Sequence, residues 1–330
     1  MKKNVFFLVL MCLFLFTSPH FSTASGSSYA VIDAKTGRLL FGSSPHTEYP
    51  IASLTKIWTA YVTSDEVDTK EETIISSNAA TQEGSSLYLK SGEKKRVDTL
   101  LYGLMLRSGN DAAVALAEHV GGSVEGFVDI MNEKADRSGL HHTTFRNPSG
   151  LNHEEHLSSA YDTALMLKLA MDNKQLRKIM STKSYQKDGV NWENKHKLVR
   201  TDPLAIAGKT GFTKASGRTL ATYFKKGKEE VIVVTLNNSN DWLVHKELAN
   251  QAFKEYDIVQ IVKEGMYNLP GDLVVNVEEP IEMLIKRKEN ISHVVLISRL
   301  KSGKRDANWN IQIDGENVLK KQVDIEQSRR

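Results

Sequence analysis

Three short motifs in a fixed order constrain this chain more than any other feature of its sequence. S-L-T-K occupies residues 53–56, S-G-N residues 108–110 and K-T-G residues 209–211. A serine and a lysine three residues apart lie on one face when their segment is helical. The three motifs together supply a nucleophile, candidate bases and an anion-binding strand, which are the groups that acyl transfer needs. We therefore expect a fold that brings three distant segments to one site.

Each motif also has further copies, so local context must decide which copy belongs to the site. The further copies are the S-x-x-K patterns at Ser91, Ser184 and Ser298, the K-T-G at residues 35–37 and the S-S-N at residues 76–78. Ser53 opens a stretch with helical apolar spacing, and a serine at a helix N-terminus meets the positive end of the helix dipole. Residues 35–37 lie between two strand-like runs and predict a hairpin turn, whereas residues 209–211 follow an apolar run and precede two further strands. Context therefore favours the ordered set.

The residues around the motifs carry a family resemblance. I-A-S-L-T-K at residues 51–56, L-R-S-G-N-D-A-A at 106–113 and G-K-T-G-F-T at 208–213 resemble the low-molecular-mass penicillin-binding proteins. These are the D-alanyl-D-alanine carboxypeptidases of the peptidase S11 type. F-R-N-P-S-G-L at 145–151 and S-S-A-Y-D at 158–162 look like further landmarks of this family, and the resemblance runs from about residue 29 to about residue 256. Gly109 stands where class A β-lactamases usually have aspartate, which favours a carboxypeptidase.

The resemblance implies an α/β (α+β) fold of the penicillin-binding and β-lactamase-like kind, with an antiparallel sheet flanked by helices and a helical subdomain. The sequence pattern agrees, because strand-like runs near both ends enclose a helical middle. The expected strands are residues 29–33, 38–41, the K-T-G strand, 218–224 and 231–236, with short strands at 72–77 and 87–90. The expected helices are one starting at Ser53 and those at residues 97–107, 111–120, 124–137, 160–171, 173–181 and 242–256.

The motif residues suggest a division of labour in catalysis. Ser53 is the expected nucleophile, and Lys56 is placed to take its proton. A solvated lysine is protonated at neutral pH, so burial and the nearby charge of Lys209 must lower the pKa of Lys56. Ser108 is expected to relay a proton to the leaving group, and Asn110 to hold the substrate's peptide amide. The identity of the acylation base remains open between these groups.

The resemblance adds roles for the third motif and a substrate. It implies an oxyanion hole formed by the backbone amides of Ser53 and Phe212, with Lys209 and Thr210 binding the terminal carboxylate of the substrate. Gly211 would permit close approach of the substrate backbone. Arg200 or Arg218 are alternatives for assisting the carboxylate, although either can equally be a solvated surface charge. The implied substrates are peptidoglycan stem peptides, β-lactam antibiotics are implied as inhibitors, and we expect no cofactor and no metal ion.

Three other functions were weighed against this one. A zinc site would draw on His141, His142, His153 and His156, but their spacing matches no catalytic zinc signature and we expect them to be solvated. A catalytically silent β-lactam sensor is disfavoured because every chemical residue is present. A β-lactamase would need a glutamate that activates water. Glu154 and Glu155 lack the sequence pattern of that base, so we expect penicillin to be released slowly.

The first 24 residues have the pattern of a secretory signal peptide. Lys2 and Lys3 precede an apolar run at residues 5–16, and S-T-A at 22–24 offers a cleavage site. An uncleaved membrane anchor is the alternative, and lipid attachment at Cys12, the only cysteine, is disfavoured because Met11 precedes it. Loss of the two lysines lowers the net charge from +3 to +1, which gives no argument for nucleic-acid binding. We expect an exported bacterial protein that works at the cell wall or the outer face of the membrane.

The chain divides by pattern into a catalytic domain at residues 25–262 and a small β-rich module at residues 265–330. Alternating apolar residues predict strands at 273–277, 281–286, 293–299, 308–313 and 318–323. Members of the resembling family often carry a membrane-binding amphipathic helix after such a module. No such helix follows the last expected strand here, so peripheral membrane contact is left open without a C-terminal anchor.

Overall fold

The computed structural model describes residues 26–187, 189–299 and 305–327. Its main sheet has five antiparallel strands in the order β2-β1-β9-β8-β7. The strands are β1 Ser28–Asp33, β2 Leu39–Ser43, β7 Ala205–Thr213, β8 Gly217–Lys226 and β9 Glu229–Leu236. β1 pairs with β9 from Ser28 opposite Leu236 to Asp33 opposite Val231. The expected sheet, built from segments near both ends of the chain, is confirmed.

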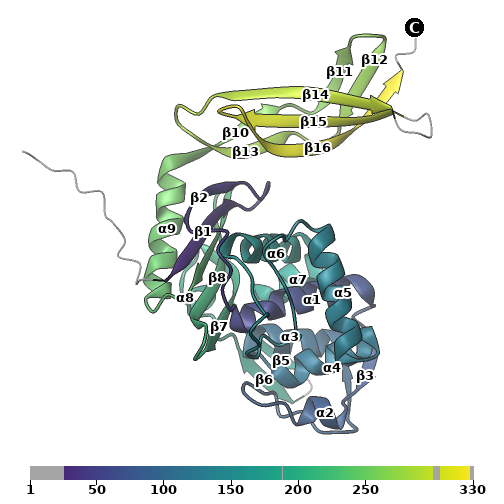
Figure 1. Ribbon diagram of the computed structural model, residues 1–330, viewed down its shortest axis with the longest axis vertical. Coiled ribbons are helices and arrows are strands. Elements are labelled where there is room, and N and C mark those ends of the chain that lie inside the picture. The colour runs from purple at the N-terminus through teal and green to yellow at the C-terminus, as the bar shows by residue number, and fades with distance from the viewer. Residues whose placement is uncertain (1–25, 188, 300–304, 328–330) are drawn as a thin grey trace, which may run out of the picture.

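Helices cover both faces of this sheet (Figure 1). The helical region comprises η1 Ala52–Leu54, α1 Thr55–Glu66, α2 Ser77–Ala80, α3 Val97–Arg107, α4 Asn110–Gly121, α5 Val124–Arg137, α6 Ala160–Asp172 and α7 Lys174–Met180. α6 packs on β1, β8 and β9, and the apolar faces of α1, α3 and α4 close a single core around the buried Trp58. Burial of such faces is what stabilises helices of this length in a protein.

The opposite face of the sheet is covered by α9 Asp241–Glu255 and the short α8 Lys197–Thr201. Leu248 and Phe253 of α9 pack against Val231, Val233 and Phe224 of the sheet in a second core. Alternate residues of β9 therefore face two different cores, which explains why this strand is apolar at every position from Val231 to Val234.

Among the described residues that follow α9, every regular element is a strand (Figure 1). Its strands are β10 Tyr256–Val262, β11 Gly265–Leu269, β12 Leu273–Val277, β13 Ile281–Lys286, β14 Ile291–Arg299, β15 Arg305–Ile313 and β16 Glu316–Gln327. β10 pairs with β13, and the others form a sheet in the order β11-β12-β16-β15-β14. β10, which falls within residues 25–262, thus pairs with a strand from the C-terminal β-rich part.

The hairpin β1–β2 docks onto β13 through its turn. Arg38 donates to the carbonyl of Leu284 at 2.9 Å, and the N–H of Leu284 donates to Asp33 at 3.0 Å. Lys35 forms an ion pair with Glu282 at 2.9 Å. The K-T-G at residues 35–37 is therefore the turn of a hairpin, as predicted, and serves an interface between the two parts.

The segment after α2 differs from the sequence-based expectation. Residues 87–90 form no strand, and β3 Glu72–Ile74 pairs with β4 Lys94–Arg96 instead. The reason is tertiary: the buried carboxylate of Asp111 accepts the backbone N–H of Leu87 at 2.8 Å and of Leu89 at 3.2 Å. The hairpin of β5 Ser184–Lys187 and β6 Val190–Glu193 was also not predicted.

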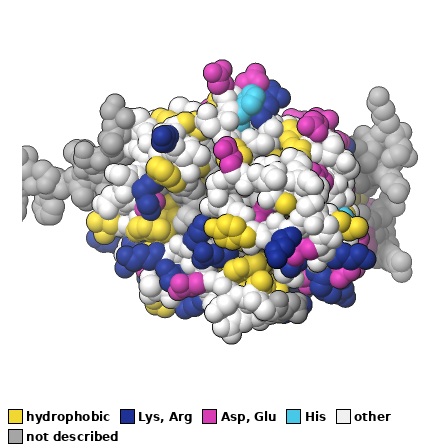
Figure 2. Space-filling model, turned by 90° about the horizontal axis from the view of Figure 1, so that it is seen from below, with side chains coloured by type: hydrophobic (Ala, Val, Ile, Leu, Met, Phe, Trp, Pro, Cys, Tyr) yellow, Lys and Arg dark blue, Asp and Glu magenta, His cyan; other side chains and the backbone are white. Residues whose placement is uncertain are grey.

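No helix within the described ranges has the length and apolar character that crossing a bilayer requires. Figure 2 shows the face seen from below in the orientation of Figure 1, where basic, acidic and hydrophobic side chains are interspersed. Charge on this face is therefore not segregated into one patch of a single sign.

Candidate active site

The first motif lies on a tight turn that leads into α1. Residues 52–54 form the 3-10 helix η1, so the α-helix itself begins at Thr55 rather than at Ser53. Ala52 has a φ of 47°, in the left-handed region that side chains rarely adopt. Ser53 is partly buried, whereas its helix neighbours are fully buried. The turn thus presents the serine at the surface of a rigid element.

Lys56 is fully buried directly behind Ser53. Its Nζ lies 3.0 Å from Ser53 Oγ, 2.7 Å from Asn110 Oδ1 and 2.5 Å from the carbonyl oxygen of Ser149. The first two contacts bring together residues from the first and second motifs, as the sequence predicted. The contact with the Ser149 carbonyl was not predicted.

The pKa values of the two motif lysines are both lowered. Burial lowers the pKa of Lys56 well below its usual value, and the charges of Lys209 and Lys195 lower it further, against a smaller opposing effect of Asp111. Burial, with a contribution from Lys195, lowers the pKa of Lys209 to about 7. Lys209 can therefore lose a proton near neutral pH, and Lys56 loses its proton more readily than a solvated lysine does.

The second motif stands at the junction of two helices. α3 ends at Arg107, Ser108 adopts a left-handed conformation with a φ of 66°, and α4 begins at Asn110. Ser108 Oγ lies 3.0 Å from Lys209 Nζ, so the second and third motifs also meet. The Asn110 side chain donates to the carbonyl of Glu83 at 2.6 Å, which fixes its oxygen toward Lys56.

The third motif lies on β7, which ends the sheet within the described residues. Arg218 on β8 is paired in register with Phe212 on β7. Its carbonyl points away from β7, because it accepts the backbone N–H of Asn238 on the opposite side of β8. Backbone groups alternate in direction along a strand, so Phe212 must direct its N–H away from β8, toward the open edge. Thr210, two residues earlier in the same unbroken register, has the same direction, and its carbonyl accepts from Lys209 Nζ at 2.6 Å.

Gly211 brings this open edge against the serine turn. A Cβ at position 211 would lie 2.3 Å from Thr219 Oγ1 and 3.0 Å from the backbone nitrogen of Ser53. Only a residue without a side chain permits that approach. The amide of Ser53 and the outward amide of Phe212 are therefore neighbours, each on a separate backbone segment.

The two arginines considered for carboxylate binding are both paired with acidic side chains. Arg218 donates to both carboxylate oxygens of Asp241, at 2.9 and 3.0 Å, and its guanidinium lies over the ring of Trp242. Arg200 pairs with Glu193. Lys195 was missed by the sequence analysis: its Nζ lies 3.1 Å from Ser85 Oγ, and its charge lowers the pKa of both motif lysines.

The loop before α6 supplies groups that have no chemical signature in the sequence. The carbonyl of Ser149 accepts from Lys56, and Gly150 has a φ of 80° with space for no side chain, since a Cβ would lie 1.9 Å from the Ala52 oxygen. Asn147 Oδ1 holds the turn by accepting the N–H groups of Ser149 and Gly150, at 3.1 and 2.7 Å. A P-S-G turn signal could have located this turn, but not its contact with Lys56.

The histidines considered for zinc do not behave alike. His141 and His153 are exposed, but His156 is 3% exposed and lies 2.7 Å from Thr55 Oγ1, so the expectation that all four are solvated was wrong. The described part of the chain contains no group of three or more potential metal ligands. Glu154 and Glu155 are exposed, and Glu155 pairs with Arg146 at 3.0 Å.

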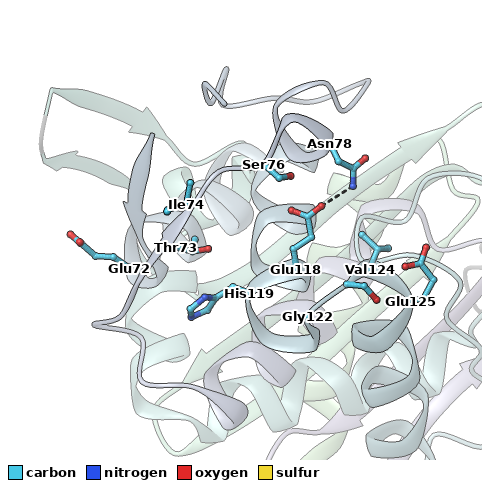
Figure 3. Close-up of a pocket in the computed structure, with 11 residues that line it drawn as sticks. Glu72, Thr73, Ile74, Ser76, Asn78, Glu118, His119, Gly122, Val124 and Glu125 are labelled. Atoms are coloured by element: carbon cyan, nitrogen blue, oxygen red, sulfur yellow. Dashed lines mark hydrogen bonds between the residues drawn. The ribbon is translucent and has the colours of Figure 1, made fainter. Parts of the chain in front are cut away.

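A hollow at the far end of α4 is separate from this site (Figure 3). It lies between β3, α2 and the α4–α5 turn, and Asn78 donates to Glu118 across it at 2.8 Å. Ser76 and Asn78 of the S-S-N at residues 76–78, one of the further motif copies, line this hollow. None of the residues of the ordered motif set does.

Comparisons with known proteins agree on one family. A family model described as D-alanyl-D-alanine carboxypeptidase, peptidase S11, matches residues 16–240. The chain is 31% identical over 291 residues to D-alanyl-D-alanine carboxypeptidase DacF of Bacillus subtilis (strain 168), covering 81% of this chain and 74% of the relative. It is 30% identical over 275 residues to D-alanyl-D-alanine carboxypeptidase DacC of Escherichia coli (strain K12), covering 76% and 69% respectively. The fold is similar to that of penicillin binding protein 5 from Haemophilus influenzae, with a TM-score of 0.77 at 22% identity over 91% of this chain and 96% of the other.

Proposed function

The chain belongs to the D-alanyl-D-alanine carboxypeptidase family, peptidase S11, and from this premise we propose that Ser53 forms its acyl-enzyme with Lys56 as the base. The observation that supports this proposal most directly is the set of hydrogen-bond partners around Lys56 Nζ. A neutral amine has two N–H donors and one lone pair. The two carbonyl oxygens of Asn110 and Ser149 take the donors, so the lone pair is left to accept the proton of Ser53 Oγ.

The developing charge would be stabilised by backbone amides. The amides of Ser53 and Phe212 are neighbours, and Phe212 directs its N–H away from β8, so the two can form an oxyanion hole for the tetrahedral intermediate. Ser108 Oγ contacts Lys209 Nζ, and Asn110, two residues further on, contacts Lys56, which suits a proton relay by Ser108 to the departing D-alanine nitrogen. We therefore assign catalysis to Ser53, Lys56, Ser108 and Asn110.

Substrate binding would use the open edge of β7. An extended stem peptide can pair with this edge, where Thr210 and Phe212 face outward, in the manner of an added strand. Lys209 and Thr210 would bind the terminal carboxylate, and Gly211 leaves room for the peptide. The proposed substrates are the D-Ala-D-Ala ends of peptidoglycan stem peptides, with β-lactams as covalent inhibitors.

We further propose where the reaction takes place and which part performs it. Export through residues 1–24, which lie outside the described residues, would deliver the enzyme to the cell wall or the outer face of the membrane. Residues 25–262 would form the catalytic domain, and residues 265–330 an accessory module. Support comes from the three motifs, all of which lie between residues 53 and 211.

The test of this function is the fate of Ser53. Residues 25–330, incubated with a stem pentapeptide, should release D-alanine as free product, and brief exposure to penicillin should add one adduct to nearly every molecule. Ser53→Ala should abolish both D-alanine release and the adduct, because Ser53 Oγ is the hydroxyl that is hydrogen bonded to Lys56 Nζ. Peptide mass spectrometry would locate the adduct.

Ser91→Ala is the matched control, because Ser91 starts another S-x-x-K pattern. Its hydroxyl is hydrogen bonded to the Ser77 hydroxyl at 2.9 Å rather than to a residue of the ordered motif set. This variant should retain both activities. The adduct should persist for minutes, since Glu154 and Glu155 are exposed. An adduct on Ser91 or Ser184 would overturn the assignment of Ser53, and rapid recovery with excess hydrolysed drug would indicate a β-lactamase.

A second expected result concerns Lys195. Its positive charge lowers the pKa of Lys56 and Lys209, so Lys195→Gln should raise both pKa values. The base must be neutral, and the acid-side limb of the kcat/KM profile should therefore move to higher pH. Lys195→Arg keeps the charge and should leave the limb in place. The displacement should shrink at high salt, because exposed charges are screened; a shift to lower pH would contradict this role.

A further inference from the structure

The segment at residues 145–158 forms the support beneath the turn that carries Ser53. Two of its contacts already belong to the site, namely Ser149 with Lys56 and Gly150 with Ala52. A third contact has no role in the chemistry described above: the buried ring of His156 lies against Thr55, the residue between the turn and the lysine.

Hydrogen bonds fix one tautomer of His156. Its Nδ1 accepts the backbone N–H of Arg146 at 3.1 Å, so the ring proton must be on Nε2. Nε2–H then donates to Thr55 Oγ1 at 2.7 Å, and the Thr55 hydroxyl donates onward to the carbonyl oxygen of Ala52 at 2.8 Å. Every proton in this series of hydrogen bonds has a single direction, and the Ala52 oxygen accepts the backbone N–H of Thr55 as well as the Thr55 hydroxyl.

This series of hydrogen bonds ends at the Ala52 carbonyl, which belongs to the peptide unit that joins Ala52 to the nucleophile Ser53. The carbonyl of Ala52 and the N–H of Ser53 belong to one planar trans peptide, so fixing the direction of the oxygen fixes the opposite direction of the N–H. Ala52 is held with a φ of 47°, a strained conformation that needs support from its surroundings. The Ser53 amide is the group that faces Gly211 at the open edge of β7.

We propose that Thr55 and His156 are positioning residues that aim the Ser53 amide at the oxyanion through the Ala52 carbonyl. This rests on the proposed function, in which that amide stabilises the tetrahedral intermediate. The pair touches no substrate and transfers no proton. Its effect should therefore fall on the chemical step, where the oxyanion develops, rather than on substrate binding.

Thr55→Val removes the hydroxyl while keeping the shape of the side chain. Loss of a well-aimed oxyanion donor costs on the order of 10²–10³-fold in kcat, and a misdirected donor should cost less, about 10- to 100-fold. KM should stay within about twofold. The rate constant of acylation by penicillin, measured by stopped flow, should fall by the same factor as kcat. Thr55→Ser restores the hydroxyl and should recover activity to within about threefold of wild type, by the same reasoning.

His156 offers a second pair of variants. His156→Gln places an amide N–H near the position of Nε2 and should retain much of the acylation rate, whereas His156→Leu lacks the donor and should lose it as Thr55→Val does. A purely structural role would instead follow the stability of each variant, read from thermal unfolding, and would not distinguish donors from non-donors.

The same helix provides matched controls. Thr63 is fully buried and its hydroxyl has no partner within the described structure, so Thr63→Val should change neither kcat nor acylation. Thr59→Val loses a buried hydrogen bond, from Thr59 Oγ1 to the Pro148 carbonyl at 2.6 Å, without touching Ala52. It should lower stability while leaving the acylation rate within about threefold, because no oxyanion donor moves.

The outcomes separate this inference from the proposed function. If wild type takes no label at Ser53, the proposed function fails and the inference with it. If wild type is labelled at Ser53 but Thr55→Val acylates within threefold of wild type, the function stands and the positioning role is overturned. Equal losses in Thr55→Val and Thr59→Val would likewise overturn it, since only one of the two hydroxyls contacts Ala52.

Discussion

Lys56→Arg should lower the rate of acylation by on the order of 10³-fold, within the range that a positioned general base contributes. Arginine has no accessible neutral form, so it cannot take the proton of Ser53. The pocket also fits a point-like ammonium, because three oxygens lie within 3.0 Å of Nζ in a fully buried position. Single-turnover acylation by a chromogenic β-lactam would measure the loss directly.

Two further variants keep this result interpretable. Lys56→Met fills a similar volume without charge and should lose as much activity, which would show that the loss comes from the missing base rather than from a misfolded arginine variant. Lys35→Arg, at the other K-T-G, retains its ion pair with Glu282 and should be fully active. Should Lys56→Arg acylate within threefold of wild type, the base would have to be sought elsewhere, with Lys209 the first candidate.

The main elements of the fold were predictable because each has a strong local signal. The strands β1 and β9 contain apolar runs bounded by turn residues, and α3 ends where the sequence places the S-G-N motif. Residues 87–90 were predicted wrongly as a strand because their backbone partner is a side chain, Asp111, from a distant helix. A local pattern cannot contain a partner of that kind.

The residues of the candidate site also fall into those that a local sequence signal predicts and those that it does not. Side chains that carry chemistry, such as Ser53 and Lys209, have motifs that locate them. The Ser149 carbonyl has no such signal, because every residue carries a carbonyl and only the folded loop aims one at Lys56. His156 was visible in the sequence but was grouped with exposed neighbours, since its burial depends on the packing of Phe145 and Thr55 around it.

The stability of this protein should fall steeply in acid because buried histidines are held neutral. The pKa of His196 is lowered to about 3 and that of His156 to about 4, each chiefly by burial, and the pKa of His245 is also lowered. In the unfolded chain these rings titrate near pH 6.5. Below that pH the unfolded state binds more protons, so the free energy of unfolding falls as pH falls toward the folded-state values.

The hydrogen bonds explain why the folded state resists these protons. Val199 donates its N–H to His196 Nδ1 at 3.2 Å, so His196 Nε2 is the donor, 3.0 Å from Thr222 Oγ1. The Thr222 hydroxyl then donates to His245 Nδ1 at 2.8 Å, and His245 Nε2–H donates to Thr235 at 3.0 Å. A second proton on either ring would have to be on Nδ1. That atom already accepts a hydrogen bond, so the new N–H would face another donor instead of an acceptor.

Each proton that the unfolded state binds and the folded state does not lowers the free energy of unfolding by about 1.4 kcal/mol per pH unit. The total stability of a folded domain is roughly 5–15 kcal/mol. The free energy of unfolding, measured with urea between pH 7 and 4.5, should therefore fall with pH. His156→Gln should reduce the slope of that dependence by an amount that corresponds to close to one proton. His153→Gln, at an exposed ring, should leave the slope unchanged. A slope that is the same in wild type and His156→Gln would mean that paired carboxylates, rather than buried imidazoles, govern acid unfolding.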